Sequence, residues 1–162
     1  MPVAAKEFTR AMSRVPAPVT VATTVDRSGR PWGFTSSSVS SLSLSPPLVL
    51  LCLDKTASTH EAFTSATHFM VNVLAEEQSE IARRFATSGI ERFAAGDTRP
   101  AELGLPGIPQ AVVRVACSMF KIFDGGDHSI LTGCVEATHV ADRAPLVYCD
   151  RAFVHLVDAE RV

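Results

Sequence analysis

A dense row of hydroxyl side chains lies in the first third of the chain. In GFTSSSVSSLSLS (residues 33–45), eight of the eleven positions from Thr35 to Ser45 are Ser or Thr. A flexible Ser-rich linker is one interpretation, but VTVATTV precedes the row and PPLVLLCL follows it, and both are typical of buried strands. The apolar residues within the row change face near Ser40, as a bend or bulge would require. The row is therefore predicted to be one kinked strand that offers hydroxyls and close backbone approach.

The signatures of several familiar chemistries are missing from the sequence. No G-x-G-x-x-G follows a strand, because Gly125 and Gly126 fall in a predicted hairpin, and neither a G-K-[ST] phosphate loop nor a G-x-S-x-G elbow is present. His60 and Glu61 begin an H-E-x-x-H pattern, but position 64 is Thr. No metal site is expected.

The four cysteines are widely spaced along the chain and form no C-x-x-C pair. They are Cys52, Cys117, Cys134 and Cys149, and three of them lie in strand-like runs. Buried, reduced thiols are the favoured interpretation.

The elements that position these residues are mostly strands. Apolar spacing predicts a first helix that Pro16 ends, a helix within residues 54–67 capped by Thr56, Ser58 or Thr59, and a third helix within residues 78–88. One long Gly- and Pro-rich loop is expected at residues 94–110. Strands are expected at 19–25, 33–45, 48–53, 68–75, 111–123, 129–140 and 144–156. Six or seven mainly antiparallel strands with inserted helices predict a barrel-like β core.

Composition limits the class of protein. The 162 residues are 46% hydrophobic, which suits one domain over residues 1–162. A formal net charge of -2 without a basic cluster argues against a nucleic-acid partner. No run approaches the roughly 20 apolar residues of a membrane span, and residues 1–15 have no apolar signal segment, so a soluble cytoplasmic protein is expected.

The order of several short motifs resembles a known family. They are the first helix ending in V-P, then G-F-T-S-S-S, S-P-P-L, K-T-A-S, A-R-R-F-A followed by R-F, G-D-H, and Y-C-D-R-A-F. Together they resemble the short-chain flavin reductases, which supply reduced flavin to two-component flavin-dependent monooxygenases. The resemblance covers nearly the whole chain. It implies a split β-barrel of antiparallel strands, of the Greek-key, FMN-binding type.

The resemblance also implies a set of flavin-binding residues. An isoalloxazine has one polar edge, which small hydroxyl residues can approach closely. The carried-over positions are Thr35, Ser36, Ser37 and Ser38 for the ring, Cys52, Leu53 and Asp54 beside it, Ala57, Ser58 and Thr59 for the ribityl phosphate, and Arg84, Arg92 and Phe93 as further contacts. The alternative for Ser58 and Thr59 is an ordinary helix cap.

The resemblance assigns His128, in the G-D-H motif, to the place where a nicotinamide stacks on the flavin. The alternative is a solvated turn residue. Hydride passes directly between the two rings, so the protein needs to orient them and needs no strong acid or base. Tyr148, Arg151 and Phe153 match the closing motif, and packing of a last strand on the core explains them equally well.

Three functions remain open from the sequence. The first is an NAD(P)H-dependent reductase that binds FMN or FAD, reduces it with NADH or NADPH, and releases it to a monooxygenase. The second is a flavoprotein that keeps FMN as a prosthetic group and reduces another acceptor, and the third is a flavin carrier without turnover. A homodimer is expected in each case, because a two-fold partner would cover an exposed barrel face.

Overall fold

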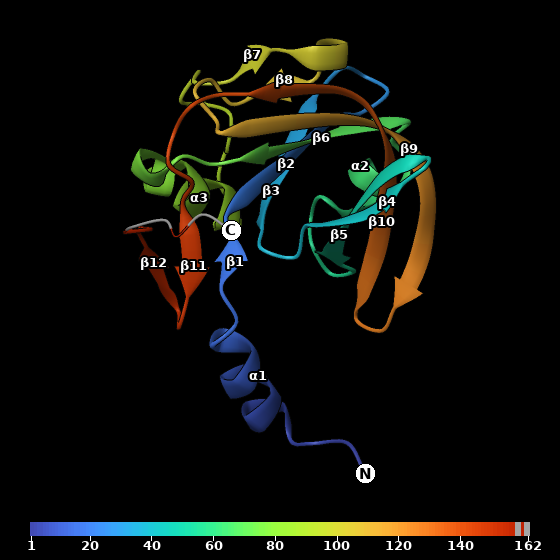
Figure 1. Cartoon of the computed structure of the whole chain (residues 1–162). Helices are drawn as coiled ribbons and strands as arrows, with labels where there is room; N and C mark the ends of the chain where they lie inside the picture. Colours follow the sequence, from blue (N-terminus) through green and yellow to red (C-terminus); the bar gives the residue numbers. More distant parts are fainter. Residues whose placement is uncertain (158–159, 161–162) are drawn as a thin grey trace.

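A seven-stranded sheet forms the body of the molecule in the computed structural model, which describes residues 1–157 and 160 (Figure 1). The strand order is β3-β2-β6-β9-β10-β5-β4, and every neighbouring pair is antiparallel. The strands are β2 (Thr20–Val25), β3 (Pro31–Ser36), β4 (Ser40–Leu44), β5 (Pro47–Asp54), β6 (His68–Val73), β9 (Val113–Gly125) and β10 (His128–Val140). The prediction of a mainly β, antiparallel fold is confirmed.

The hydroxyl row forms two strands and not the single kinked strand that its pattern predicted. β3 and β4 are consecutive in the chain but occupy opposite ends of the sheet. Only residues 37–39 connect them, a link that spans at most roughly 14 Å. The two edges of the sheet must therefore approach each other, and the sheet curls around a buried interior (Figure 1).

Two helices pack against the β2–β3 end of the sheet. The helix α3 (Ser79–Ala86) follows the 3-10 turn η1 (Glu76–Gln78) and buries Ala82 and Phe85. Gly33 is needed under it, because a Cβ there would lie 2.8 Å from Cε1 of Phe85. The helix α2 (His60–Thr64) is much shorter than predicted, since the chain between β5 and α2 consists of turns.

The last third of the chain differs from the prediction. The expected strand over residues 144–156 is a hairpin of β11 (Val147–Cys149) and β12 (Ala152–Val154), which joins β1 (Ala17–Pro18) in a small separate sheet. The strand pattern is interrupted because Asp150 and Arg151 have φ of 53° and 62°, values that form a tight turn. The expected loop over residues 94–110 contains the ribbon of β7 (Arg99–Pro100) and β8 (Pro106–Gly107), with the 3-10 turn η2 (Glu102–Gly104) between them.

The core lies inside the curled sheet and under α3. Phe34 and Phe63 meet there edge to face, with 4.9 Å between ring centroids. All four cysteines are free, but only Cys117 is fully buried, and burial raises the pKa of its thiol to about 12. Within the described residues, no helix is both long enough and apolar enough to cross a membrane.

The first helix, α1 (Ala5–Ser13), forms as predicted but lies outside the core. It projects away from the sheets (Figure 1), and none of its residues is buried. Phe8 is 57% exposed and Met12 is 50% exposed. Its apolar face therefore has no partner within the described chain.

Candidate functional site

A cavity of about 690 Å³ opens where β3, β5, the turn before α2 and the segment after α3 meet. We call it the main cavity. It brings together all but two of the residues that the sequence predicted for the flavin and nicotinamide. Those that line it are Thr35, Ser36, Ser37, Ser38, Cys52, Leu53, Asp54, Ala57, Ser58, Thr59, Arg92 and His128.

The first four residues of the hydroxyl row, Thr35 to Ser38, line the main cavity, and three of their hydroxyls also have protein partners. Thr35 donates its Oγ1 hydrogen to the carbonyl oxygen of Ala82 at 2.6 Å, which fastens β3 to α3. The hydroxyls of Ser36 and Ser38 lie 2.9 Å apart, and the backbone N–H of Cys52 donates to Ser38 Oγ at 3.0 Å. Ser37 is exposed in the same wall. A ligand edge in the cavity would therefore meet hydroxyls whose orientations are largely fixed.

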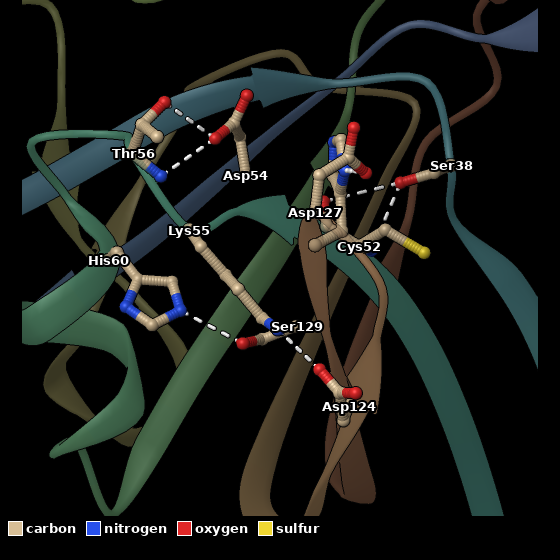
Figure 2. Close-up of polar contacts among 10 residues, drawn as sticks. Ser38, Cys52, Asp54, Lys55, Thr56, His60, Asp124, Asp127 and Ser129 are labelled. Carbon is tan, nitrogen blue, oxygen red and sulfur yellow. Dashed lines mark hydrogen bonds and ion pairs between the residues drawn. The ribbon is translucent and has the colours of Figure 1, made fainter.

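The end of β5 is shaped by a turn that Asp54 organises (Figure 2). Asp54 Oδ1 accepts hydrogen bonds from the backbone N–H and the hydroxyl of Thr56, both at 2.7 Å. These bonds, first of all the one from the Thr56 hydroxyl, hold the pKa of Asp54 below its ordinary value. The carboxylate therefore positions the turn that carries Ala57, Ser58 and Thr59 into the cavity.

Thr59 has an unusual environment at the floor of this cavity. It occupies the N-cap position of α2, yet its side chain makes no capping hydrogen bond. The residue is 3% exposed, and its Oγ1 is the only buried side-chain nitrogen or oxygen in the described part of the chain that lacks a hydrogen-bond partner. The helix-cap alternative therefore fails for Thr59. A buried hydroxyl without a partner costs free energy, and a phosphate oxygen in the cavity would supply that partner.

Arg92 is the one arginine or lysine in the lining of the main cavity. Its Nη1 donates to the Gly33 carbonyl at 2.7 Å and its Nε to the Thr87 carbonyl at 3.0 Å. These bonds hold the guanidinium between β3 and the end of α3, and partial burial lowers the pKa of Arg92. A half-buried arginine beside Thr59 suits an anionic group.

Arg84 and Phe93 lie outside the main cavity. Nη2 of Arg84 donates to both carboxylate oxygens of Asp97 at 2.7 Å. Its Nε donates to the Arg92 carbonyl at 2.9 Å. Phe93 packs edge to face on Phe85 with 5.1 Å between centroids. The two residues shape the segment that carries Arg92. Their part in flavin binding remains a prediction.

His128 lies in the lining of the main cavity, at the start of β10. Its Cα partner across the sheet is Asp54, and its side chain is 41% exposed. Nδ1 lies 2.7 Å from Asp127 Oδ1, so the ring orientation is set by a neighbouring carboxylate. Next along β10, Ser129 lies 2.9 Å from His60 Nε2, a contact that ties α2 to this strand (Figure 2).

The motif Y-C-D-R-A-F does not reach the main cavity. Tyr148 and Phe153 face each other across the β11-β12 hairpin with 6.0 Å between centroids, and Phe153 packs on the core beneath α3. Arg151 lies in the turn. The packing alternative explains these three residues.

Several residues of the main cavity were not predicted from the sequence. They are Phe34, Thr56, Phe85, Ala86, Ser88 and Gly89. The sequence contained a cue for Gly89, because a glycine directly after a helical pattern indicates a turn. In the structure Gly89 has a φ of 75° and forms the turn after α3. In the described residues, no three His, Cys, Asp or Glu side chains gather as a metal site would require.

Comparison with known proteins gives one family. The model of the flavin reductase like domain matches residues 12–156. The chain is 42% identical to an actinorhodin polyketide dimerase from Streptomyces coelicolor, over 92% of this chain and 85% of that protein. It is 38% identical to an NADH:riboflavin 5'-phosphate oxidoreductase from Streptomyces pristinaespiralis, over 91% of this chain and 86% of that protein.

Two further similarities extend this result. HsaB, the reductase subunit of a flavin-dependent monooxygenase from Mycobacterium tuberculosis, is 40% identical over 74% of this chain and 63% of its own length. Among solved structures, the NADH:FAD oxidoreductase SgcE6 from Streptomyces globisporus, in complex with NAD and FAD fragments, superposes with a TM-score of 0.91. The two sequences are 33% identical, and 99% of each chain is covered.

Proposed function

Because the chain belongs to the family of flavin reductase-like domains, we propose that it is an NAD(P)H:flavin oxidoreductase that reduces FMN or FAD. The reduced flavin leaves the protein and serves a flavin-dependent monooxygenase. The observation that carries the proposal is the main cavity, where the hydroxyl row, the turn before α2 and His128 converge. Relatives named as an NADH:riboflavin 5'-phosphate oxidoreductase and a monooxygenase reductase subunit support the reaction and the partner.

The residues of the main cavity fit a flavin mononucleotide unit. The orphan hydroxyl of Thr59 and the guanidinium of Arg92 suit its phosphate, and the wall of Ser36 to Ser38 suits the polar edge of its ring. The flavin ring supplies the chemistry, since it accepts a hydride from a nicotinamide. The side chains of the chain bind and orient the two rings, and His128 stands where it can contact the nicotinamide.

The proposal also covers the domain organisation, the oligomeric state and the cellular compartment of the protein. We infer that residues 1–162 form one domain and that the curled sheet is a split barrel, in which the Ser38 hydroxyl just after β3 accepts a hydrogen bond from the Cys52 backbone in β5. The chain pairs as a homodimer, which would cover apolar side chains such as Leu44, 91% exposed, and Phe123, 48% exposed. Four free thiols fit a reducing compartment, and the cytoplasm also supplies NADH.

Anaerobic mixing of the purified protein with NADH or NADPH and free FMN, FAD or riboflavin tests the function. We expect many equivalents of added flavin to be reduced per protein chain, followed by release. Turnover that requires a different acceptor while one flavin stays bound would favour a prosthetic-group flavoprotein. Saturable flavin binding without oxidation of either nicotinamide would leave only a carrier. Elemental analysis should find no stoichiometric metal.

A further inference from the structure

A second cavity of about 490 Å³ adjoins the main cavity. We call it the Trp32 cavity. The two share Ser58, Thr59, Gly89 and Arg92, so the proposed phosphate position lies on their common border. Beyond this border, Arg30 and Trp32 line the second cavity, and His128 does not. The residues proposed for the flavin ring do not line it.

The far end of the Trp32 cavity carries a flat aromatic and cationic pair. The guanidinium carbon of Arg30 lies over the Trp32 ring, 4.4 Å from its centroid. Trp32 Nε1 donates to Asp26 Oδ2 at 2.9 Å, which fixes the ring in its plane. Hydrogen bonds from Ser28 and Trp32 lower the pKa of Asp26, so this anchor stays ionised at neutral pH. Purine rings stack well on indole faces and on guanidinium planes.

The charge of the Trp32 cavity suits phosphate groups near its shared border. Arg30 and Arg92 contribute two positive charges to its lining, and Glu91 contributes one negative charge at 4.0 Å from Arg30. Thr59, whose buried hydroxyl lacks a protein partner, belongs to the same border. A group that links two phosphates would meet these donors between the two cavities.

We propose that the Trp32 cavity binds the adenylate half of FAD and that the protein therefore prefers FAD to FMN. The diphosphate lies over Ser58, Thr59 and Arg92, and the adenine stacks on the Arg30–Trp32 pair. The inference rests on the proposed function, since it takes the flavin ring to lie in the main cavity. It adds a specificity site, made by Arg30 and Trp32, that the reaction itself does not require.

NADH also contains an adenylate half, so it is the alternative ligand for the Trp32 cavity. The lining residues favour FAD. The Trp32 cavity shares with the main cavity the residues proposed for the flavin phosphate, whereas His128, the proposed nicotinamide contact, does not line it. Kinetics separate the two sources. With FMN as acceptor, changes at Trp32 should leave the KM for NADH as it is.

Equilibrium titrations with FAD, FMN and riboflavin test the proposal in four proteins. Wild type should bind FAD more tightly than FMN. Trp32→Leu should raise the Kd for FAD roughly 5- to 150-fold, the range for losing one stacked base, while the Kd for FMN changes by no more than about twofold. Arg30→Gln should act in the same direction. Arg27→Gln is the matched control, because Arg27 is exposed in the same turn and does not line the Trp32 cavity.

The outcomes distinguish the inference from the function on which it rests. No saturable binding of any flavin to wild type would remove the proposed function. Flavin binding with FMN at least as tight as FAD, or equal losses for FMN and FAD in Trp32→Leu, would overturn the inference alone. A raised KM for NADH would assign the cavity to the nicotinamide dinucleotide and also overturn it.

A spectroscopic signal gives independent evidence. Trp32 is the only tryptophan of the chain, so its fluorescence reports on this cavity alone. ADP carries the adenine and the diphosphate but no flavin, and its binding should quench the emission and compete with FAD more strongly than with riboflavin. An emission that ADP leaves unchanged at concentrations that displace FAD would contradict stacking at Trp32.

Discussion

A hydrogen bond between Ser38 and Cys52 fastens the end of β3 to β5 across the curled sheet. Ser38 lies in the short link that leaves β3, and the backbone N–H of Cys52, in β5, donates to its hydroxyl at 3.0 Å. The same pair lies in the wall of the main cavity. One hydroxyl thus stabilises the closure of the sheet and shapes the proposed ring site.

Ser38→Ala should therefore lower the free energy of unfolding by about 1 kcal/mol, because the Cys52 N–H loses its partner. Flavin affinity should fall as well. Ser37→Ala is the matched control, since Ser37 is exposed in the same wall, and its change should weaken flavin binding without altering stability. Urea denaturation and flavin titration measure the two effects. Equal stability of both variants would show that the Ser38–Cys52 bond contributes nothing to the fold.

Thr59→Val should affect stability and binding in opposite directions. The unbound protein should become more stable by about 1 kcal/mol, because a buried hydroxyl without a partner is replaced by a methyl group. The Kd for FMN should rise about tenfold or more, while that for riboflavin, which lacks the phosphate, stays the same. The double variant Ser58→Ala with Thr59→Ala should show the same difference between the two ligands.

Thr35→Val provides the control for this experiment. Its hydroxyl donates to the Ala82 carbonyl, so the same substitution there should destabilise the protein by about 1 to 3 kcal/mol. If Thr59→Val weakened FMN and riboflavin equally, the hydroxyl would have no phosphate to bind.

His128→Ala should reduce the rate constant for flavin reduction by NADH and leave the flavin Kd nearly unchanged. Orientation of the nicotinamide by one contact is worth about 1 to 3 kcal/mol of barrier, which corresponds to 5- to 150-fold in rate. Stopped-flow measurements of the reductive half-reaction give this value. His139→Ala, an exposed change near the other end of β10, serves as control. A wild-type rate in His128→Ala would remove His128 from the reaction.

The ion pair of Glu102 and Arg114 should make the free energy of unfolding depend on pH. Arg114 donates to both carboxylate oxygens of Glu102 at 2.9 Å and lowers the pKa of Glu102 from 4.5 to about 2. Since the folded pKa lies below the unfolded value, the stabilisation is complete above pH 4.5 and is lost as the pH falls toward 2. We expect a loss on the order of 2 kcal/mol over this interval, and a smaller loss in Glu102→Gln. Parallel acid-denaturation curves for the two proteins would refute the effect.

Local patterns in the sequence determined most of the elements and most of the site. The alternation and β-branched runs of Val19–Val25 and the apolar run after Pro46 predicted strands, and α3 followed from the spacing of Ile81 and Phe85. The motif order, starting with the hydroxyl row, indicated the family. Such features depend on neighbours a few residues away, which the sequence displays directly.

Only the tertiary structure decided which groups meet. The uniform residues of the hydroxyl row predict one strand, yet its two halves lie at opposite edges of the sheet. Ser38, in the link between them, accepts a hydrogen bond from Cys52 of β5. Arg84 turns to Asp97 and away from the main cavity, and Thr59 is left without a partner. Each outcome depends on strand order and on which buried groups approach within hydrogen-bond distance. Those long-range approaches arise from packing the whole sheet, and no local pattern encodes them.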